Sequence, residues 1–266
     1  MSVIEIDGAV RRYRQGSGVG PIHLTLERGE VVSIVGPSGC GKTTLLELVA
    51  GLQLPEEGCV YANGVRVTGP SPERQVVFQD GALFPWLSVA DNVAYGLRAR
   101  RVERSVIEVR TMAALEAVNL VHAAELRPHQ LSGGMKQRAA LARALVVDPG
   151  AVLLDEPFSA LDEPTRSMLQ RDVADLLSRR RTTCLLITHS VEEACLLSDR
   201  VVVLTGPPGR IAGIVPIDVA RPRTRGAISA AVREVGALLL AQVHTNGKGD
   251  YRQPRLDGGW LTRHMG

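Results

Sequence analysis

The amino-acid sequence predicts an α/β protein with a parallel-sheet core, an N-terminal antiparallel β subdomain and a helical subdomain. Two observations predict the core. A glycine-rich loop stands between an apolar run of strand type, residues 31–35, and a helical pattern at residues 44–50. A second run of buried-strand type, within residues 151–157, ends in two adjacent carboxylates, Asp155 and Glu156. Strand–loop–helix units of this kind build parallel sheets, and ligands bind at the carboxyl ends of their strands.

Composition limits the class of protein. A chain of 266 residues can form one large α/β domain with a small subdomain, and with 45% apolar but only 3% aromatic residues its core must be aliphatic. The net charge of +3 is too small to indicate a nucleic-acid partner. The four cysteines form no C-x-x-C pair and predict reduced thiols of a cytosolic protein. We find no signal-peptide pattern and no apolar stretch near the ~18 residues of a membrane span, so we expect any pore to be another polypeptide.

The N-terminal part predicts a small sheet followed by the first core unit. Residues 2–27 alternate as two antiparallel strands, joined by a flexible turn at residues 15–20 that contains three glycines. Residues 28–80 then carry the glycine-rich loop and return to the core sheet just before Gln79.

The rest of the chain predicts a helical insert and a return to the core. Residues 81–130 form the insert, because apolar residues recur at i, i+3 and i+4 in two of its segments. Residues 131–205 continue the α/β core. Beyond them we expect a last strand at 210–215, an amphipathic helix at 227–244 and a tail, 245–266, without packed structure. The two helical segments of the insert are residues 89–101 and 106–120.

The glycine-rich loop matches the phosphate-binding pattern G-x-x-x-x-G-K-[ST]. Glycines let the backbone approach an anion closely, and the following helix presents its N-terminus to the same anion. Lys42 adds a positive charge beside the β- and γ-phosphates, and the Thr43 hydroxyl can take one place on Mg²⁺. We therefore expect a nucleotide site built from Gly36, Pro37, Ser38, Gly39, Cys40, Gly41, Lys42, Thr43 and Thr44.

The carboxylate pair after the second apolar run predicts a hydrolytic function. At the end of its strand Asp155 can face the Mg²⁺ shell, and Glu156 can polarise a water in line with the γ-phosphate. The alternative is an ordinary acidic turn after a strand. It loses weight because Lys42 lies far away in the sequence, so that several βα units can bring both strand ends to one sheet edge.

A second helix start has the features of an anion site. Ser132 is a good N-cap residue, and Gly133 and Gly134 leave free N–H groups at the positive end of the helix dipole, before a helical stretch at 135–146. An ordinary capped helix would explain this segment equally well in isolation.

In this order, the motifs resemble those of the nucleotide-binding subunit of an ATP-binding cassette (ABC) transporter, whose signature L-S-G-G-Q is similar to residues 131–135. Met135 replaces the signature glutamine, as is common in the importer subgroup discussed below. The resemblance covers residues 2–220. It implies a P-loop NTPase core of ABC type at residues 1–220, with the helical subdomain at about 81–130, and a C-terminal helix and tail at 221–266.

The resemblance also assigns further site residues. Gln79 matches the glutamine that reaches toward Mg²⁺ and the attacking water, and His189 matches the switch histidine at the end of a strand. Asp162 matches the loop that contacts the other cassette of a dimer. Tyr13 matches the aromatic residue that stacks on adenine, although packing on an edge strand is the simpler explanation of a lone tyrosine. The implied catalytic set is Glu156, His189 and Gln79, and the implied metal set is Thr43, Gln79 and Asp155.

The implied mechanism needs a second copy of the chain. In a head-to-tail dimer, the Ser132 helix start of one chain closes on the ATP and Mg²⁺ held by Lys42 and Thr43 of the other chain. Closure and ATP hydrolysis then alternate. A soluble ABC-type ATPase would carry coiled coils or two cassettes, and a P-loop GTPase would carry N-K-x-D; neither is present in this sequence.

Four segments resemble the nitrate, sulfonate and taurine importer ATPases: residues 84–86, 135–138, 190–194 and 206–211. The resemblance implies a peripheral subunit on the cytoplasmic face of the membrane, bound to integral permease subunits and served indirectly by an extracytoplasmic solute-binding protein. That subgroup is also similar to cassettes that import bicarbonate or vitamin precursors, so the resemblance implies a small solute of the nitrate, sulfonate or taurine type or of the vitamin-precursor type. No residue here indicates which solute is carried.

A loop directly after Gln79 is the expected docking site for the permease. It contains Phe84 and Trp86, and large apolar groups in a loop usually find a cover. The alternative, in which both rings pack on the helical insert of the same chain, remains open.

Overall fold

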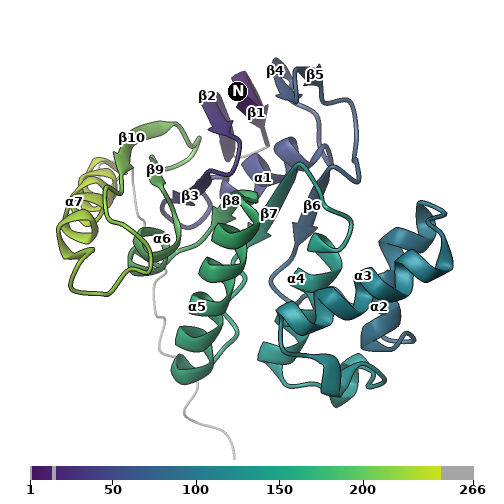
Figure 1. Ribbon diagram of the computed structural model, residues 1–266. Coiled ribbons are helices and arrows are strands. Elements are labelled where there is room, and N and C mark those ends of the chain that lie inside the picture. The colour runs from purple at the N-terminus through teal and green to yellow at the C-terminus, as the bar shows by residue number, and fades with distance from the viewer. Residues whose placement is uncertain (1, 14–15, 247–266) are drawn as a thin grey trace, which may run out of the picture.

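The structure is a computed structural model that describes residues 2–13 and 16–246. It contains an antiparallel sheet and a larger, mostly parallel sheet, with helix α1 (Lys42–Ala50) packed between them (Figure 1). Helices α4 (Gly133–Leu145) and α5 (Glu163–Arg180) cover the other face of the larger sheet. The predicted α/β class is confirmed.

The antiparallel sheet has four strands in the order β2 (Gly18–Glu27), β1 (Ser2–Arg12), β4 (Glu57–Ala62) and β5 (Val65–Arg66). The sequence analysis placed only residues 2–27 in this sheet, so it missed β4 and β5. Both strands are short, and β5 and the first half of β4 are largely exposed, which leaves almost no alternating pattern to detect. The turn before β2 is also shorter than predicted, because the strand already begins at Gly18.

The larger sheet has the order β10-β9-β3-β8-β7-β6, and only β10 runs antiparallel to its neighbour. Strands β3 and β8 are buried on both faces, which explains their continuous apolar sequences. The predicted strand at 31–35 is confirmed to the residue, and the strand predicted within residues 151–157 is confirmed as β7, which ends at the first of the two carboxylates, Asp155. The strand bounds are β3 (Val31–Val35), β6 (Arg74–Val77), β7 (Ala151–Asp155), β8 (Thr183–Ile187), β9 (Arg200–Leu204) and β10 (Ile211–Pro216).

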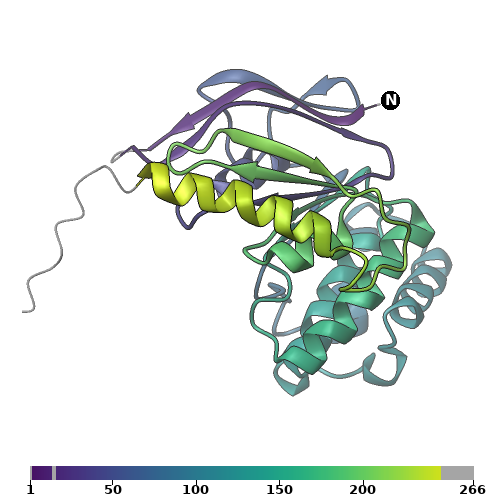
Figure 2. The ribbon, with the colours of Figure 1, turned by 90° about the vertical axis from the view of Figure 1, so that its left-hand side faces the viewer.

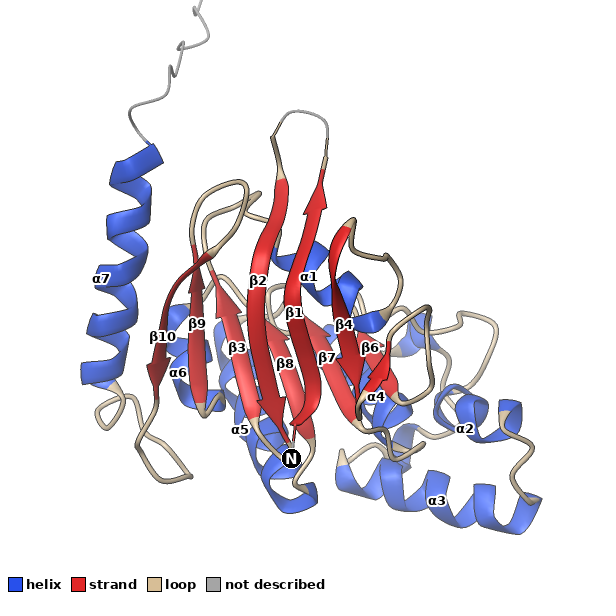
Figure 3. Cartoon of the chain, turned by 90° about the horizontal axis from the view of Figure 1, so that it is seen from above, coloured by secondary structure: helices blue, strands red, loops and turns tan. Residues whose placement is uncertain are grey.

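Helices α2 (Val89–Ala99) and α3 (Arg104–Ala117) occupy the segment predicted to be a helical insert, and two 3₁₀ turns, Val121–Ala123 and Pro128–Gln130, complete it. Their apolar faces pack with α4 (Gly133–Leu145) in one core cluster. Figure 3 shows α2 and α3 at one side of the two sheets and α7 at the opposite side.

Helices α5 (Glu163–Arg180) and α6 (Val191–Leu197) follow β7 and β8, and α7 (Ser229–Asn246) lies along β9 and β10 (Figure 2). The predicted last helix is therefore confirmed within two residues at each end. Of the tail expected to lack packed structure, residues 247–266 lie outside the described part. Among the described residues, no helix combines the length and the apolar character needed to cross a membrane.

Candidate nucleotide-binding site

The candidate site lies where four parallel strands end side by side. The ladders align Val77 of β6 with Leu154 of β7, and Leu154 with Leu186 of β8. Leu186 in turn aligns with Ser33 of β3. The polar residues that follow these strands therefore meet at one edge of the sheet, as the sequence analysis expected for the phosphate loop and the carboxylate pair.

The phosphate loop connects β3 to α1 and is tightly packed at its last glycine. Gly41 has φ of 93°, and a Cβ there would lie 2.5 Å from Val19 Cγ1 and 2.6 Å from the carbonyl oxygen of Gly18. Only glycine fits this backbone conformation and this space. The loop thus rests against β2 of the antiparallel sheet, and α1 starts directly after it.

Lys42 is held inside the loop that it follows. It is 9% exposed, and its Nζ donates to the carbonyl oxygens of Gly36 at 3.0 Å and Pro37 at 3.1 Å. The ammonium therefore lies at the centre of the loop, where an anion would gather the surrounding N–H groups. Cys40 beside it is fully buried, and burial, partly offset by the charge of Lys42, raises the pKa of its thiol. The sulfur packs as a neutral, unreactive group.

Asp155 ends β7 and has an electrostatic environment that suits a divalent cation. Burial first, and then the charges of Glu156 and Glu47, raise the pKa of its carboxyl group, while the Thr43 hydroxyl and Lys42 act in the opposite direction. A cation here would offset the repulsion between the carboxylates. Among the described residues, no group of three or more His, Cys, Asp or Glu that could hold a metal ion is found.

Glu156 and His189 form a pair across the ends of β7 and β8. His189 Nδ1 lies 3.3 Å from Glu156 Oε2. The backbone N–H of Glu156 donates to the carbonyl oxygen of Ile187 at 2.9 Å, and Ser159 Oγ donates to the carbonyl oxygen of Glu156. Glu156 has φ of 45°, an unusual conformation for a non-glycine residue that turns the chain sharply after the strand.

Gln79 and Tyr13 lie on the two flanks of the site. Gln79 is exposed in the turn after β6, and the preceding carbonyl oxygen, of Phe78, accepts a 3.4 Å hydrogen bond from Gln137. Tyr13 follows β1, and its hydroxyl donates to Gln53 Oε1 at 2.8 Å. The alternative explanation placed Tyr13 on an edge strand. This is wrong, because β1 lies between β2 and β4 in the interior of its sheet.

Ser132 and Asp162 cap two helices that pack on each other. Ser132 Oγ accepts from the N–H of Met135, and Asp162 Oδ2 accepts from that of Thr165, each at 3.3 Å. A Cβ on Gly134 would lie 2.8 Å from Thr165 Cγ2, so glycine allows the α4 start to approach α5 closely. Within the described residues no hydrogen bond or ion pair joins Ser132 to the phosphate loop.

The sequence analysis missed the residues that surround His189 and Glu156. A small pocket beside Glu156 and His189 is also lined by Thr188, Arg166 and Glu193. Ser190 caps α6 by accepting from the N–H of Glu193, and burial raises the pKa of the Glu193 carboxyl group. The S-x-x-E spacing of residues 190–193 is a helix-start signal that could have located α6, but it does not indicate that the helix begins at the site.

These features define the class of protein: an α/β domain in which a phosphate loop and a carboxylate pair follow parallel strands of the same sheet, β3 and β7. Comparison with known proteins gives the family. The family model described as "ABC transporter" matches residues 19–159, about half of the chain. The chain belongs to the ABC transporter family.

Curated relatives support this membership along most of the chain. It is 48% identical over 209 residues to the bicarbonate transport ATP-binding protein CmpC of Synechococcus elongatus, covering 77% of this chain but only 31% of CmpC. It is 45% identical over 210 residues to the nitrate import ATP-binding protein NrtD of the same species, covering 78% of this chain and 77% of NrtD. The chain thus spans about a third of CmpC and most of NrtD.

Solved structures confirm the ABC type of the fold. CbiO1 from Clostridium perfringens, described as part of the transporter complex CbiONQ, has a TM-score of 0.74 and 25% identity, covering 92% of this chain and 99% of its own. The dimeric cassette MJ0796 bound to ADP and phosphate has a TM-score of 0.70 and 26% identity, covering 82% of this chain and all of its own.

The environment of Asp155 predicts a cost to stability in the absence of nucleotide and metal. The pKa of Asp155 is raised in the folded protein. In the pH range just above the usual aspartate pKa of about 4, the folded protein therefore binds more protons than the unfolded chain. The free energy of unfolding falls as the pH rises through this range. We expect Asp155→Asn to raise the Tm of the nucleotide-free protein by a few degrees at pH 7 and by less at pH 4.5, measured by thermal unfolding with EDTA. Asp218→Asn, at an exposed position, is the control. A lower Tm for Asp155→Asn at pH 7 would contradict the assignment.

Proposed function

We propose that this chain is the ATP-hydrolysing subunit that powers import of a small solute through a separate membrane permease. The main observation in support of ATP hydrolysis is the Glu156–His189 pair, which lies at the same sheet edge as Lys42 and Asp155. Import is supported by the printed functions of NrtD and CmpC, which concern nitrate and bicarbonate. We assign a small inorganic or organic anion as the solute class, together with peripheral attachment to the cytoplasmic face of the membrane.

In this proposal each residue at the edge has one role. Residues 36–44, with Lys42 among them, bind the phosphates. Thr43, Asp155 and Gln79 would hold Mg²⁺, which would neutralise charge on the transferring phosphoryl group. Glu156 orients and polarises the attacking water, and His189, 3.3 Å away, keeps the carboxylate in place. Tyr13 stacks on the adenine ring. The hydrogen bond from its hydroxyl to Gln53 is either broken on stacking or kept while the ring turns.

The second candidate function is a soluble ABC-type ATPase without a transport partner. The observation that favours transport is an exposed aromatic group after β6. The ring centroid of Phe84 lies 5.6 Å from that of Trp86 and 4.6 Å from that of Tyr95, and Trp86 is 68% exposed. A soluble ATPase has no evident use for this surface.

The loop that carries these rings is rigidly built. Asn92, fully buried in α2, accepts from the N–H of Phe84 and donates to the carbonyl oxygens of Phe84, Leu87 and Ser88. The guanidinium of Arg143 lies over the Phe84 ring and donates to the carbonyl oxygens of residues 81 and 82. Phe84 is thus partly packed within the chain, as the alternative held, whereas Trp86 remains available. We propose Trp86 as the main contact with the permease.

A head-to-tail dimer accounts for the separation of the two anion-binding helix starts. Ser132 is exposed and makes no polar contact with the phosphate loop of its own chain among the described residues, so a second copy is the natural source of the Ser132 helix start. The solved structure of MJ0796 with ADP and phosphate is a dimer. We propose that residues 132–134 of one copy complete the site of the other, with Asp162 at the contact.

The first prediction concerns hydrolysis. Glu156→Gln keeps the shape of the side chain but removes the base, so we expect kcat for Mg-ATP to fall about 10²-fold or more while ATP binding is retained. Steady-state turnover and equilibrium binding of the nucleotide measure the two effects. Glu192→Gln, at a partly exposed position in the first turn of α6 that pairs with Arg225, is the matched control and should keep normal turnover. Near-normal kcat in Glu156→Gln would remove Glu156 as the base.

The second prediction concerns the composite site. Lys42→Ala and Ser132→Arg chains should each be inactive alone, because each spoils both sites of a homodimer. A verified heterodimer of the two contains one intact site and should recover measurable ATPase activity. If verified heterodimers stay as inactive as either homodimer, both motifs act within one chain and the head-to-tail arrangement is wrong.

The third prediction distinguishes a transporter subunit from a soluble ABC-type ATPase. Trp86→Ala should leave folding and basal ATPase activity unchanged, because the ring is mostly exposed, and should weaken co-purification with the permease subunits about tenfold or more, as expected for a hot-spot tryptophan. Val109→Ala, also exposed but on α3, is the control. Normal assembly and transport with Trp86→Ala would end the docking proposal.

A further inference from the structure

A cavity of about 520 Å³ lies away from the phosphate loop, between α5, α6 and residues 221–225. Its volume is within the range of small-molecule sites, roughly 300–1,000 Å³. Part of its wall is apolar, formed by Ala174, Leu196, Leu197 and Pro222. The rest is strongly basic: Arg171, Arg221, Arg223 and Arg225 line it, against one acidic residue, Asp175.

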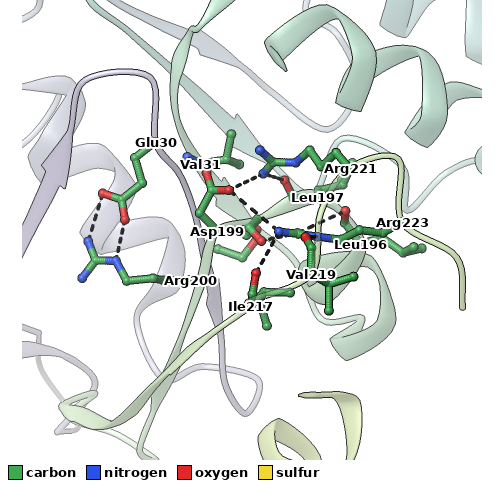
Figure 4. Close-up of polar contacts among 12 residues, drawn as sticks. Glu30, Val31, Leu196, Leu197, Asp199, Arg200, Ile217, Val219, Arg221 and Arg223 are labelled. Atoms are coloured by element: carbon green, nitrogen blue, oxygen red, sulfur yellow. Dashed lines mark hydrogen bonds and ion pairs between the residues drawn. The ribbon is translucent and has the colours of Figure 1, made fainter. Parts of the chain in front are cut away.

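The inner wall of the cavity carries an excess of positive charge. Arg221 and Arg223 share a single carboxylate, with Asp199 Oδ1 at 2.9 Å from the first and 3.8 Å from the second (Figure 4). Arg223 is almost fully buried, and burial, followed by the charge of Arg221, lowers the pKa of its guanidinium. Arg223 donates instead to the carbonyl oxygens of Cys195, Leu196, Ser198, Ile217 and Val219.

Two guanidinium groups keep unused donors. Arg221 Nε is buried and finds no hydrogen-bond partner within the described residues. Arg171, on the exposed side of α5, donates only to the carbonyl oxygen of Ser167 and forms no ion pair in the described part of the chain. By contrast, Arg225 at the rim is neutralised by Glu163 and Glu192. Arg221 Nε itself is enclosed by the protein. An oxyanion in the cavity would therefore accept from the exposed Arg171 guanidinium and be attracted by the charge of the Arg221 side chain, which is 24% exposed.

One hydrogen bond connects the wall of the cavity to a residue that lies beside the hydrolytic pair. Gln170 lines the cavity, and its Nε2 donates to Glu193 Oε2 at 3.0 Å. Glu193 lines the small pocket beside His189 and Glu156, and its N–H donates to Ser190, the residue after His189. A ligand that fixes α5 against α6 would therefore act on the segment that positions His189.

From these contacts we propose that the cavity is an effector site for a small organic oxyanion with a short apolar body. The anionic head binds Arg171 and Arg221, and the body rests on Ala174 and Leu197. Binding restrains α6 and so changes the rate of hydrolysis at Glu156. The binding step is independent of the proposed ATPase function, whereas the effect on rate rests on it.

Binding is tested by calorimetric titration of the nucleotide-free protein with glutarate, butanesulfonate and the neutral glutaramide. We expect both anions to bind and glutaramide not to bind. Arg171→Gln should weaken anion binding about tenfold or more, since it removes a charged donor. Ala174→Phe should abolish binding by filling the cavity without changing its charge. Arg104→Gln, an exposed arginine on α3, and Lys42→Ala, which spoils the phosphate loop, should both bind as the parent does.

The outcomes separate the steps of the proposal. Absence of anion binding up to about 10 mM, an affinity too weak for an effector, overturns the site. Binding that is lost in Lys42→Ala but kept in Arg171→Gln places the anion at the phosphate loop and also overturns it. Binding as expected, with the ATPase rate unchanged at saturating glutarate, overturns the coupling to α6. A chain without any ATPase activity would refute the proposed function but leave the titration decisive for the site.

Discussion

The shared register of β6, β7, β8 and β3 is the constraint on which the rest of the site depends. With Val77, Leu154, Leu186 and Ser33 aligned across the four strands, Gln79 and Glu156 each lie two residues beyond the same level. His189 lies three residues beyond it, level with Gly36. Because side chains alternate with period two, a slip of one residue in a single ladder would turn Asp155 or Glu156 away from the edge. Hydrogen-bonded ladders in the centre of a buried sheet are therefore what fixes the distance between Glu156 and His189.

A second constraint is steric and joins the two sheets. The missing Cβ of Gly41 makes room for the backbone of Gly18 and the side chain of Val19, so the phosphate loop cannot move without displacing β2. β1 and β2 are paired along most of their length, and Tyr13 follows β1 directly. The position of Tyr13 relative to the phosphate loop is thus set by backbone packing rather than by contacts of the tyrosine itself.

The sequence predicted the elements whose signal is local. The glycine loop, the buried strands β3 and β7 and the capped helix at Ser132 were predicted correctly. In each case the signal, a motif, an apolar run or a cap residue, lies within a few residues of sequence. β4 and β5 escaped because their exposed residues carry no alternation. The Glu156–His189 contact and the cavity at Arg171 and Arg221 depend on ladders and packing between segments distant in the chain. The position of β1 between β2 and β4 also depends on pairing between distant segments. No local pattern in a single sequence encodes such pairings.

The carboxylate of Asp199 ties the segment at residues 221–223 to the strand that leads into the nucleotide site. Its Oδ2 accepts from the N–H of Val31 at 2.9 Å, while Oδ1 faces Arg221 and Arg223. Next to it, Arg200 forms a bidentate pair with Glu30 (Figure 4). Val31 begins the strand whose other end is the phosphate loop. One carboxylate therefore anchors the start of β3, the end of α6 and the segment around Arg223 together. Arg223 also caps α6, because it donates to carbonyl oxygens of the last residues of that helix, Cys195 and Leu196. A shift of the segment around Arg223 would therefore move α6, whose N-cap, Ser190, directly follows His189.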